Sequence, residues 1–363
     1  MRLLVLANAF PSAEHPAYGS YVAGGAETLV AQGHDVRVVA LGAGRRGTIA
    51  TPLAYAGLAA RALGTALTWR PDAILAHFLV PTGSIARRTA TLARVPYVLV
   101  AHGTDVANAE TSDRLRRATV AAVSGAAGVV CVSQSLGERL EALTGPLGPR
   151  LQIISAGVDV SRFRPGDREV AATALGWDAP GPRICQLGNL VEVKNPLRLL
   201  EAFAELRRTQ PGAGLALVGD GPLRESLLAR AADLGISDAL RMPGERAGDE
   251  VARWLRAAHV CTLASLREGF GLAVVEGLAC GRPVAVSEAA GAASLVQEGV
   301  TGALLDPLDV SSIASAIERS ARLEPGSAAV ESAAPYSREH EMRRLAALLA
   351  EVVRRTGGAP VTG

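Results

Sequence analysis

Short apolar segments rich in β-branched residues alternate with longer amphipathic segments along the whole chain, and this alternation constrains the fold more than any other feature. Strands that alternate with helices predict parallel sheets built from β-α-β units. The expected strands of the first half are Leu3–Ala7, Val36–Ala40, Ala73–His77, Tyr97–Ala101, Val129–Val132 and Gln152–Ile154. Those of the second half are Ile184–Leu187, Leu215–Val218, Leu240–Met242, Val260–Leu263, Pro283–Val286 and Ala303–Leu305. Because the strands are apolar throughout, we expect helices on both faces of each sheet.

The rhythm of strands and helices breaks once, at the charged segment Arg162–Asp167, and then restarts. The helices are expected near residues 20–32, 53–68, 82–93, 112–124 and 134–143, and then near 196–209, 222–234, 249–257, 272–280 and 309–322. A chain of 363 residues has room for two domains of roughly 100–200 residues each. We therefore predict an α/β chain with two Rossmann-like, doubly wound domains, residues 1–164 and 165–335. A C-terminal helix within residues 336–363 is expected to pack back on the first domain.

Composition excludes several classes of protein. The formal net charge is +2, which gives no electrostatic footprint for nucleic acid or an anionic membrane. Adjacent arginines such as Arg45-Arg46 and Arg343-Arg344 are typical of solvated faces. The four cysteines form no C-x-x-C pair and lie in apolar segments, which favours buried free thiols in a reducing cytoplasm. The apolar part of Leu3–Phe10 is too short for a signal peptide and fits a first strand. No run of 18 or more strongly apolar residues predicts a membrane-spanning helix.

The position of the first helix follows from its length. Gly24 and Gly25 resemble the glycine-rich turn of a phosphate loop. A helix that starts after them would be too short to cross over a strand, which takes about 12 residues. We therefore place both glycines inside a helix that begins after Gly19. The loop that shapes the ligand side of the first strand is then Phe10–Gly19.

Polar residues follow several strands of the second half, where open α/β sheets bind ligands. Glu268-Gly-Phe-Gly271 precedes a helix whose first free N–H groups favour an anion such as a diphosphate. Glu276 lies on that otherwise apolar helix, where a carboxylate needs a polar partner, and a ribose diol would provide one. With two such sheets in tandem, the default site is the cleft between them.

Two further turns of the second half carry candidate residues. Gly188-Asn189 follows a strand and leads to Lys194, which lies near the start of the next helix. A cation there is unfavourable unless an anion shares the site. Gly219 ends another strand before a proline-containing helix start, and we expect it to let a ligand approach the backbone.

In the first half, His102 and Asp105 follow one strand, in Ala101-His102-Gly-Thr-Asp105, and His77 ends a neighbouring strand. Because both histidines lie at the carboxyl ends of strands, we assign them to a functional site together with Asp105. A purely structural role is the alternative for each of these residues, and for the turns at Lys194 and Gly219.

At these residues the sequence resembles family 4 of the retaining glycosyltransferases, which have the GT-B fold. The resemblance covers nearly the whole chain, and its most specific part is the E-x7-E segment from Glu268 to Glu276. It also includes Asn8–Pro11, Gly33–Val36, His102–Asp105, Gly157–Asp159, Gly188–Lys194, Gly219–Pro222, Ala279–Pro283 and Gly299–Gly302. The overall pattern is similar to that of bacterial transferases for cell-surface polysaccharides.

The resemblance implies a role for each candidate residue. Lys194, Glu268 and His102 would be catalytic: Lys194 would stabilise the diphosphate, Glu268 would bind a hydroxyl of the donor sugar, and His102 would reach the transferred sugar. Glu276 would bind the ribose. The other donor-binding residues would be Gly188, Asn189, Gly219, Gly269, Phe270 and Gly271. The acceptor side would include Gly19, His77 and Asp105.

Two departures from the family pattern and one missing motif bear on the mechanism. Asn189 replaces the usual arginine and removes a positive charge from the diphosphate site, whereas Ala156 in place of asparagine is a smaller change. The chain has no D-x-D motif to hold a catalytic metal, so we expect no metal or other cofactor, with Lys194 and helix N-termini supplying the charge. The family attacks the sugar on the face that the leaving phosphate vacates, without a protein nucleophile.

The sequence leaves the substrates open. A nucleotide-sugar donor with a UDP, GDP or similar nucleotide is expected, and the acceptor would be a saccharide, a lipid-linked sugar or a small molecule. The alternatives are a non-hydrolysing sugar-nucleotide epimerase and a non-catalytic protein that binds nucleotide sugars. A cytoplasmic location is expected, with room for peripheral association at the inner face of the membrane, and no nucleic-acid partner is expected.

Overall fold

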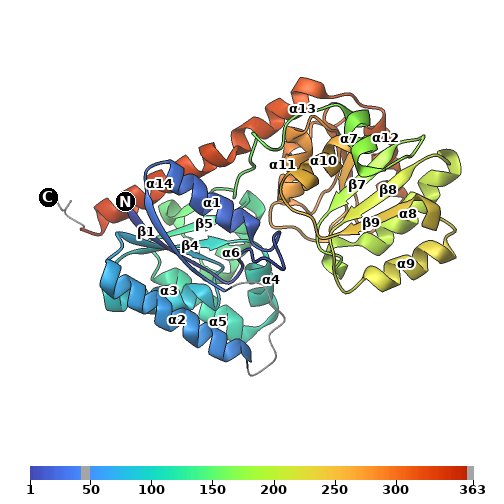
Figure 1. Cartoon of the computed structure of the whole chain (residues 1–363). Coiled ribbons are helices and arrows are strands. Elements are labelled where there is room, and N and C mark those ends of the chain that lie inside the picture. The colour runs from blue at the N-terminus through green and yellow to red at the C-terminus, as the bar shows by residue number, and fades with distance from the viewer. Residues whose placement is uncertain (42–49, 358–363) are drawn as a thin grey trace. The chain divides into compact units, whose positions relative to one another are not determined.

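The computed structural model of the chain describes residues 1–41 and 50–357, so the Arg45-Arg46 pair lies outside the described residues. The chain divides into two compact units, one formed by Met1–Gly157 with Arg338–Gly363 and the other by Val158–Ser337. Figure 1 labels their helices and strands. Within the described part, no helix is both long enough and apolar enough to cross a membrane.

The first unit contains a six-stranded parallel sheet with the order β2-β1-β3-β4-β5-β6. In chain order the strands are β1 (Arg2–Ala7), β2 (Asp35–Ala40), β3 (Ala73–His77), β4 (Tyr97–Ala101), β5 (Gly128–Cys131) and β6 (Leu151–Ile153). The chain reverses its direction of travel across the sheet between β1 and β3. Such a switch point is where open α/β sheets bind their ligands.

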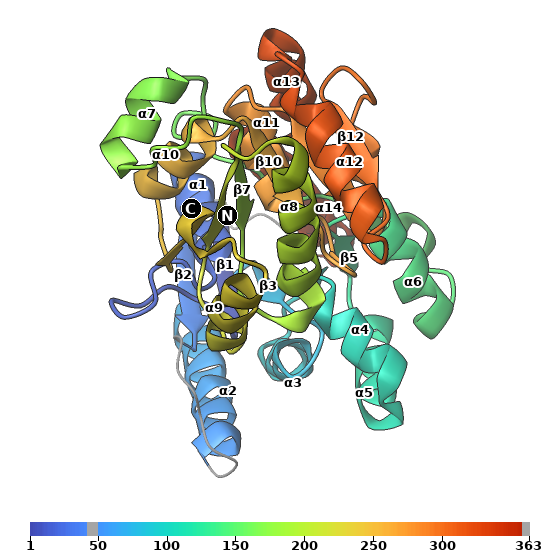
Figure 2. The same ribbon diagram turned by 90° about the vertical axis from the view of Figure 1, so that its right-hand side faces the viewer.

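Helices cover both faces of this sheet. On one face lie α1 (Ser20–Ala31) and α14 (Arg338–Arg355), whose apolar residues share a buried core with β1, β3, β4 and β5. On the other face α2 (Ala50–Trp69), α3 (Thr82–Ala93) and α5 (Asp113–Ser124) lie side by side (Figure 2). The remaining helices are α4 (Thr104–Thr111) and α6 (Gln134–Thr144).

The prediction that Gly24 and Gly25 lie inside the first helix is confirmed, and packing explains why glycine stands there. A Cβ on Gly24 would lie 2.7 Å from the guanidinium carbon of Arg338, and one on Gly25 would lie 3.3 Å from the sulfur of Met342. Both contacts come from α14, which packs closely against α1. Glycine in a helix interior is about 1 kcal/mol less favourable than alanine. The close packing of α1 on α14 requires glycine at these positions in spite of that cost.

The C-terminal helix is tied to the end of the first sheet by polar contacts. Glu341 is only 1% exposed and accepts a hydrogen bond from the backbone N–H of Ser155. Arg344 pairs with Glu341 at 2.8 Å and donates to the carbonyl oxygen of Ile153 at 2.7 Å. A buried carboxylate with two partners of this kind is costly to disrupt, so α14 is an integral part of the first unit.

The second unit contains a second six-stranded parallel sheet, with the order β12-β11-β10-β7-β8-β9. Its strands are β7 (Arg183–Leu187), β8 (Gly214–Val218), β9 (Leu240–Gly244), β10 (Val260–Leu263), β11 (Val284–Ser287) and β12 (Gly302–Leu305). One face packs on α8 (Pro196–Thr209), α9 (Arg224–Asp233) and α12 (Val310–Ala321). The other carries α10 (Asp249–Ala257) and α11 (Leu272–Ala279), which contact α7 (Arg168–Leu175) and α13 (Gly326–Ala333). The switch point lies between β7 and β10.

The sequence predicted the two doubly wound sheets, and the structure confirms them, but it missed three short helices. The helices α4, α7 and α13 each contain eight residues, about two turns, which leaves few positions for a 3.6-residue period to show. The equally short α11 was predicted, so length is only part of the reason. Asp167 caps the start of α7, and its side chain accepts a hydrogen bond from the Val170 N–H at 2.8 Å. The charged segment interpreted as a domain break therefore ends in a helix cap.

Candidate functional site

In the second unit, candidate residues gather at the switch point between β7 and β10. These two strands are neighbours in the sheet, so the loops that follow them, residues 188–195 and 264–271, leave the same edge side by side. The backbone N–H of Leu266 donates to the carbonyl oxygen of Val193 at 2.9 Å and joins the loops directly. The sheet thus places Lys194, from one loop, beside Glu268, from the other.

Lys194 and Glu268 form an ion pair in which the Nζ donates to Oε2. Their side chains are 24% and 18% exposed, so both groups remain reachable from solvent. The sequence predicted that each would bind a different part of a donor, and it did not predict that each is the other's partner. Lys194 ends a 3-10 turn, Glu192–Lys194, two residues before α8 begins at Pro196, so it lies near the start of that helix as predicted.

Asn195 is a structural residue of this site that the sequence interpretation missed. It adopts a left-handed conformation, with φ of 56°, immediately before Pro196 opens α8. Its Nδ2 donates to the carbonyl oxygens of Ala264, at 3.1 Å, and Pro307, at 2.7 Å. One buried side chain therefore links the loops after β7, β10 and β12. The signal was present, since an Asn-Pro dipeptide is typical of a turn that starts a helix.

The sequence holds a second signal that was missed: Lys194 is its only lysine, and the other basic residues among the 37 Lys and Arg are arginines. An ammonium group is a compact charge with three rotatable donors on a flexible stem, whereas a guanidinium is a planar fork. In a chain that otherwise uses arginine, a lysine at the switch point distinguishes this position chemically.

Gly188 and Gly219 allow close packing at this edge of the sheet, and their donor-binding roles stay predictions. Gly219 follows β8 with φ of 153°, and a Cβ there would overlap the carbonyl oxygen of Gly188. The loop after β7 therefore occupies the space that a side chain at position 219 would need. Gly188 has φ of 137° and lies under the stem of Lys194, whose Cε would be 3.5 Å from an added Cβ. Both glycines allow the backbone and the lysine to pack closely.

The loop Glu268–Gly271 leads into α11. Gly271 precedes the helix with φ of 102°, and a Cβ there would lie 2.8 Å from Leu263 and 3.4 Å from the Cγ of Glu268. Phe270 is only 7% exposed, and its ring packs 5.4 Å from that of Tyr336. Its carbonyl oxygen accepts from the N–H of Ala292 at 2.7 Å. The Phe270 side chain is thus a packing residue, and a donor-binding role of its backbone N–H stays a prediction.

The remaining predicted donor residues lie around this loop. Gly269 is buried in it, and Asn189 is exposed in the loop after β7. Glu276 follows Glu268 by eight residues in the chain and lies half-buried on α11, among buried apolar residues. The structure thus brings Lys194, Glu268 and the start of α11 to one edge of one sheet. The roles of these residues toward a donor stay predictions.

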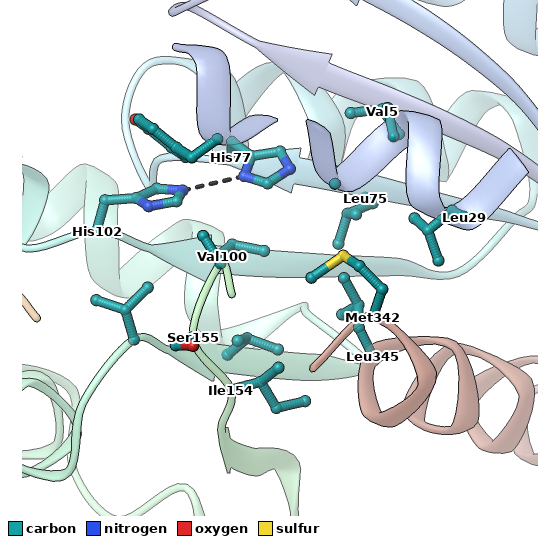
Figure 3. Close-up of a pocket in the computed structure, with 16 residues that line it drawn as sticks. Val5, Leu29, Leu75, His77, Val100, His102, Ile154, Ser155, Met342 and Leu345 are labelled. Carbon is teal, nitrogen blue, oxygen red and sulfur yellow. Dashed lines mark hydrogen bonds between the residues drawn. The ribbon is translucent and has the colours of Figure 1, made fainter. Parts of the chain in front are cut away.

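In the first unit, His77 and His102 form a hydrogen-bonded pair at the ends of β3 and β4. The Nδ1 of His77 lies 3.0 Å from the Nε2 of His102, and the rings are stacked, with centroids 5.2 Å apart (Figure 3). The rings of Tyr21 and Phe78 flank His102 at 5.0 and 4.7 Å. The sequence assigned the two histidines to one site, and the structure places them in direct contact.

Burial governs the charge of this pair. It lowers the pKa of His77 to about 4. It also lowers the pKa of His102 well below its usual value, and the nearby His77 adds to that effect. Both rings are therefore neutral at pH 7. In a neutral pair one nitrogen of the contact must donate and the other accept, so the tautomer of one ring sets that of the other.

Asp105 holds the backbone around the histidines. Its carboxylate is 7% exposed and accepts hydrogen bonds from four backbone N–H groups. These belong to Leu79, His102, Gly103 and Val106, at 2.9 to 3.1 Å. Burial raises the pKa of Asp105, and the four hydrogen bonds oppose the rise. These contacts make Asp105 a residue that positions the backbone, and its role on the acceptor side stays a prediction.

Gly19 and a small cavity complete this end of the first unit. Gly19 has φ of 70°, and a Cβ there would overlap the backbone of Ala9 and Phe10, so the loop folds back on the end of β1. Beside the histidines lies an apolar cavity of about 20 Å³, lined by residues that include Val5, Leu75, Val100 and Met342. Figure 3 shows the histidines at one end of it and Met342 at the other. Its volume is that of a single water molecule.

Each half of the chain matches a family of known proteins. Residues 19–162 match the model of Glycosyltransferase Family 4, and residues 167–335 match that of Glycosyl transferases group 1. One curated relative is D-inositol 3-phosphate glycosyltransferase of Frankia alni, 36% identical over 180 residues, which is 47% of this chain and 44% of the relative. The enzyme of that name from Acidothermus cellulolyticus is 32% identical over 273 residues, 70% of this chain and 60% of the relative. The chain thus spans about half the length of the first of these relatives.

Solved structures share the fold across nearly the whole chain. The HepE protein of Anabaena, crystallised with UDP-glucose, superposes with a TM-score of 0.79 at 20% identity and covers 97% of this chain and 100% of its own. Sucrose-phosphate synthase of Thermosynechococcus elongatus superposes with a TM-score of 0.81 at 18% identity and covers 98% and 100%. At such identities the likeness shows the fold alone. The chain therefore has the GT-B fold, and its two halves match the models of Glycosyltransferase Family 4 and of Glycosyl transferases group 1.

Proposed function

We propose that this chain is a retaining glycosyltransferase that moves a sugar from a nucleotide-diphosphate donor to a saccharide, lipid-linked or small-molecule acceptor, in the biosynthesis of a cell-surface polysaccharide or glycoconjugate. The observation that carries the proposal is the Lys194–Glu268 ion pair at the switch point of the second sheet. It sets a cation and a carboxylate side by side where such sheets bind nucleotides.

The ion pair gives the site its polarity before a donor arrives. When a donor binds, the Lys194 ammonium turns from Glu268 to the diphosphate, and the Glu268 carboxylate accepts a hydrogen bond from a sugar hydroxyl. The partly exposed position of the pair favours this exchange, because breaking a solvated ion pair costs only about 0–1 kcal/mol. The amides at the start of α11, after Gly271, provide further donors for the phosphate oxygens.

The chemistry requires charge stabilisation rather than a protein nucleophile. The bond between the anomeric carbon and the β-phosphate oxygen breaks, and the acceptor oxygen forms a new bond to that carbon on the same face. The acceptor's proton passes to the leaving phosphate oxygen. Negative charge grows on the diphosphate as the bond breaks, and Lys194 is placed to stabilise it. In this proposal no metal takes part.

The comparisons support a nucleotide-sugar donor and suggest probes for the test. Solved structures of the same fold carry UDP and UDP-glucose, and curated relatives bear the name D-inositol 3-phosphate glycosyltransferase. UDP-sugars are therefore the first donors to test, followed by GDP-sugars. The acceptors should include inositol phosphate as well as short saccharides and lipid-linked sugars.

The experiment compares donor binding, donor hydrolysis and sugar transfer by the unmodified protein. Saturable binding of one donor class, with release of its nucleotide, is the expected result, and the anomeric configuration of the product, read by NMR, tests retention. Conversion of the donor alone to an isomeric nucleotide sugar would instead identify an epimerase. A protein that binds a donor but transfers its sugar to none of the acceptors tested, and does not hydrolyse it, would be a non-catalytic nucleotide-sugar-binding protein.

A further inference from the structure

Three helices form one continuous outer layer on the first unit. α2, α3 and α5 lie side by side over the same face of the sheet (Figure 2). Because their inner sides pack on the strands, the exposed residues of all three helices face away from the sheet, on one surface. We call this the α2-α3-α5 surface.

The α2-α3-α5 surface is strongly basic. It carries six exposed arginines, which are Arg61, Arg87, Arg88, Arg114, Arg116 and Arg117. Asp113 is the only acidic residue in the three helices. Arg61 and Arg116 donate to the backbone carbonyl oxygens of Ala40 and Glu110, contacts that leave the positive charge in place.

The opposite face of the same unit has no such excess of charge. There α1 and α14 carry exposed acids, Glu27, Glu339 and Glu351, among their exposed arginines. Arg355, for example, lies 3.6 Å from Glu351. The net charge of +2 for the whole chain therefore hides a charge separation that only the fold reveals.

Apolar side chains protrude from the same surface. Leu53 and Leu67 on α2 are 68% and 53% exposed, and Leu92 on α3 is 63% exposed. Between the two leucines of α2 the exposed positions are Ala56, Gly57, Ala60, Arg61 and Gly64, so apart from Arg61 that stretch of the helix is uncharged. Single exposed leucines are ordinary, but leucines beside a field of arginines make an amphipathic surface.

We propose that the α2-α3-α5 surface binds the headgroup region of an anionic phospholipid bilayer. The guanidinium groups pair with phosphate groups of the lipids, and each arginine near an anionic membrane adds attraction. The leucines enter the boundary between headgroups and acyl chains, where apolar side chains are stabilised. Nucleic acid would satisfy the arginines but offers no apolar phase for Leu53, Leu67 and Leu92, so the bilayer is the better match.

This proposal goes beyond the catalytic site and does not depend on it. The test uses the full-length protein and co-sedimentation with vesicles of phosphatidylglycerol and phosphatidylcholine, compared with vesicles of phosphatidylcholine alone. Binding to the anionic vesicles is expected, with a steep loss between about 0.1 M and about 1 M salt, where the Debye length falls from about 10 to about 3 Å.

Two triple variants separate the two parts of the surface. Arg114→Ser with Arg116→Ser and Arg117→Ser should weaken binding to anionic vesicles by roughly tenfold or more. Leu53→Ser with Leu67→Ser and Leu92→Ser should weaken it as well and should lower its persistence at high salt. The matched control is Arg343→Ser with Arg354→Ser and Arg355→Ser, which removes the same charge from α14 and should leave vesicle binding within about twofold of the unmodified protein. Circular dichroism confirms that each variant is folded.

Three results would overturn the proposal. One is a lack of binding of the unmodified protein to anionic vesicles at low salt. Another is an equal loss of binding in the α14 control, which would mean that charge acts without regard to its position. The third is binding to duplex DNA that exceeds vesicle binding and is unaffected by the leucine substitutions, which would assign the surface to a nucleic acid.

Discussion

The Nζ of Lys194 donates to the Oε2 of Glu268 across the switch point of the second sheet, although the two residues are 74 positions apart in the chain. The pair exists because β7 and β10 are neighbours in the strand order. Each group restrains the orientation of the other. The first predictions concern what happens when one member of the pair is removed.

Lys194→Ala should abolish most of the glycosyl transfer while leaving the fold intact. Loss of one well-placed donor to a developing negative charge typically lowers kcat by about 100- to 1000-fold. Lys194→Arg should recover part of the rate, because it keeps the charge but changes the geometry of the donors. Rates are measured with the donor that the unmodified protein binds, and thermal unfolding is measured alongside.

The control for this prediction is Arg208→Ala, which removes an exposed positive charge from α8 of the same unit. It should leave kcat and KM unchanged.

Glu268→Gln should raise KM for the donor or lower kcat. It should alter the unfolding temperature by no more than a few degrees, since a partly exposed pair contributes only about 0–1 kcal/mol to stability. A Lys194→Ala protein with normal turnover would remove Lys194 from the mechanism.

Donor binding should protect Lys194 from amine-reactive reagents. Because Lys194 is the only lysine, the only other amine in the chain is the N-terminus. Reductive methylation with labelled formaldehyde should therefore give two NMR signals, and the signal assigned to Lys194 by its loss in Lys194→Arg should shift when UDP or a UDP-sugar is added. The signal of the N-terminus provides the internal control. A Lys194 signal that ignores every nucleotide and nucleotide sugar would place the donor site elsewhere, whatever the activity of the protein.

Gly219→Ala should destabilise the second unit far more than an ordinary glycine substitution. The added Cβ would overlap the carbonyl oxygen of Gly188, so one of the two loops must move, at a cost of about 3 kcal/mol or more for backbone displacement of this kind. Gly235→Ala is the matched control, because Gly235 also has a positive φ, of 68°, but nothing lies within 4 Å of its Cβ position. It should cost about 1–2 kcal/mol. Urea unfolding measures both, and equal costs would contradict the close contact.

The strands of both sheets could be predicted because a fully buried parallel strand is apolar at every position, and few other segments of that length are. Val260–Leu263 and Ala73–His77 are examples in which the expected and observed bounds coincide. The positions of Lys194, Glu268, His77 and His102 at strand ends followed from the same reasoning. The eight-residue helices α4, α7 and α13 did not, because two turns leave few positions in which a helical period can show, although the equally short α11 was predicted.

Contacts between distant loops could not be predicted from the sequence. The closeness of Lys194 to Glu268, and of Gly219 to Gly188, depends on which strands are neighbours, and strand order is a property of the whole fold. The α2-α3-α5 surface is a further case, since a net charge sums over the chain and loses the position of every residue. The single lysine and the Asn195-Pro196 turn are visible in the sequence. Their roles could be assigned only once the structure showed that the loops after β7 and β10 are neighbours.

The last prediction concerns the His77–His102 pair and its response to pH. Burial lowers the pKa of His77 to about 4 and that of His102 well below its usual value, whereas both rings have a pKa near 6.5 in the unfolded chain. The unfolded state therefore binds more protons between about pH 6.5 and about pH 4, and stability rises with pH over that window. The contribution of the pair is fully present above about pH 6.5 and is lost as the pH falls toward 4.

Urea unfolding at a series of pH values should show this loss, and His77→Asn combined with His102→Asn should flatten the profile in the same window. His259 also has its pKa lowered to about 4, first by burial and then by nearby arginines, so part of the slope should persist in the double variant and fall further when His259→Asn is added. Burial and the N-terminal charge also lower the pKa of His34, so a small slope should remain in the triple variant. His340→Asn, on the exposed side of α14, is the control. A direct measurement comes from NMR titration of the His77 and His102 rings, and titration of either ring near pH 6.5 would refute the buried neutral pair.

Because the pair is neutral at the pH of an assay, His102 can contact a sugar only through a hydrogen bond. The tautomer of His77 decides whether the Nδ1 of His102 donates or accepts in that contact. His77→Phe should therefore lower kcat/KM more than His77→Asn, whose amide can keep the contact to Nε2 of His102.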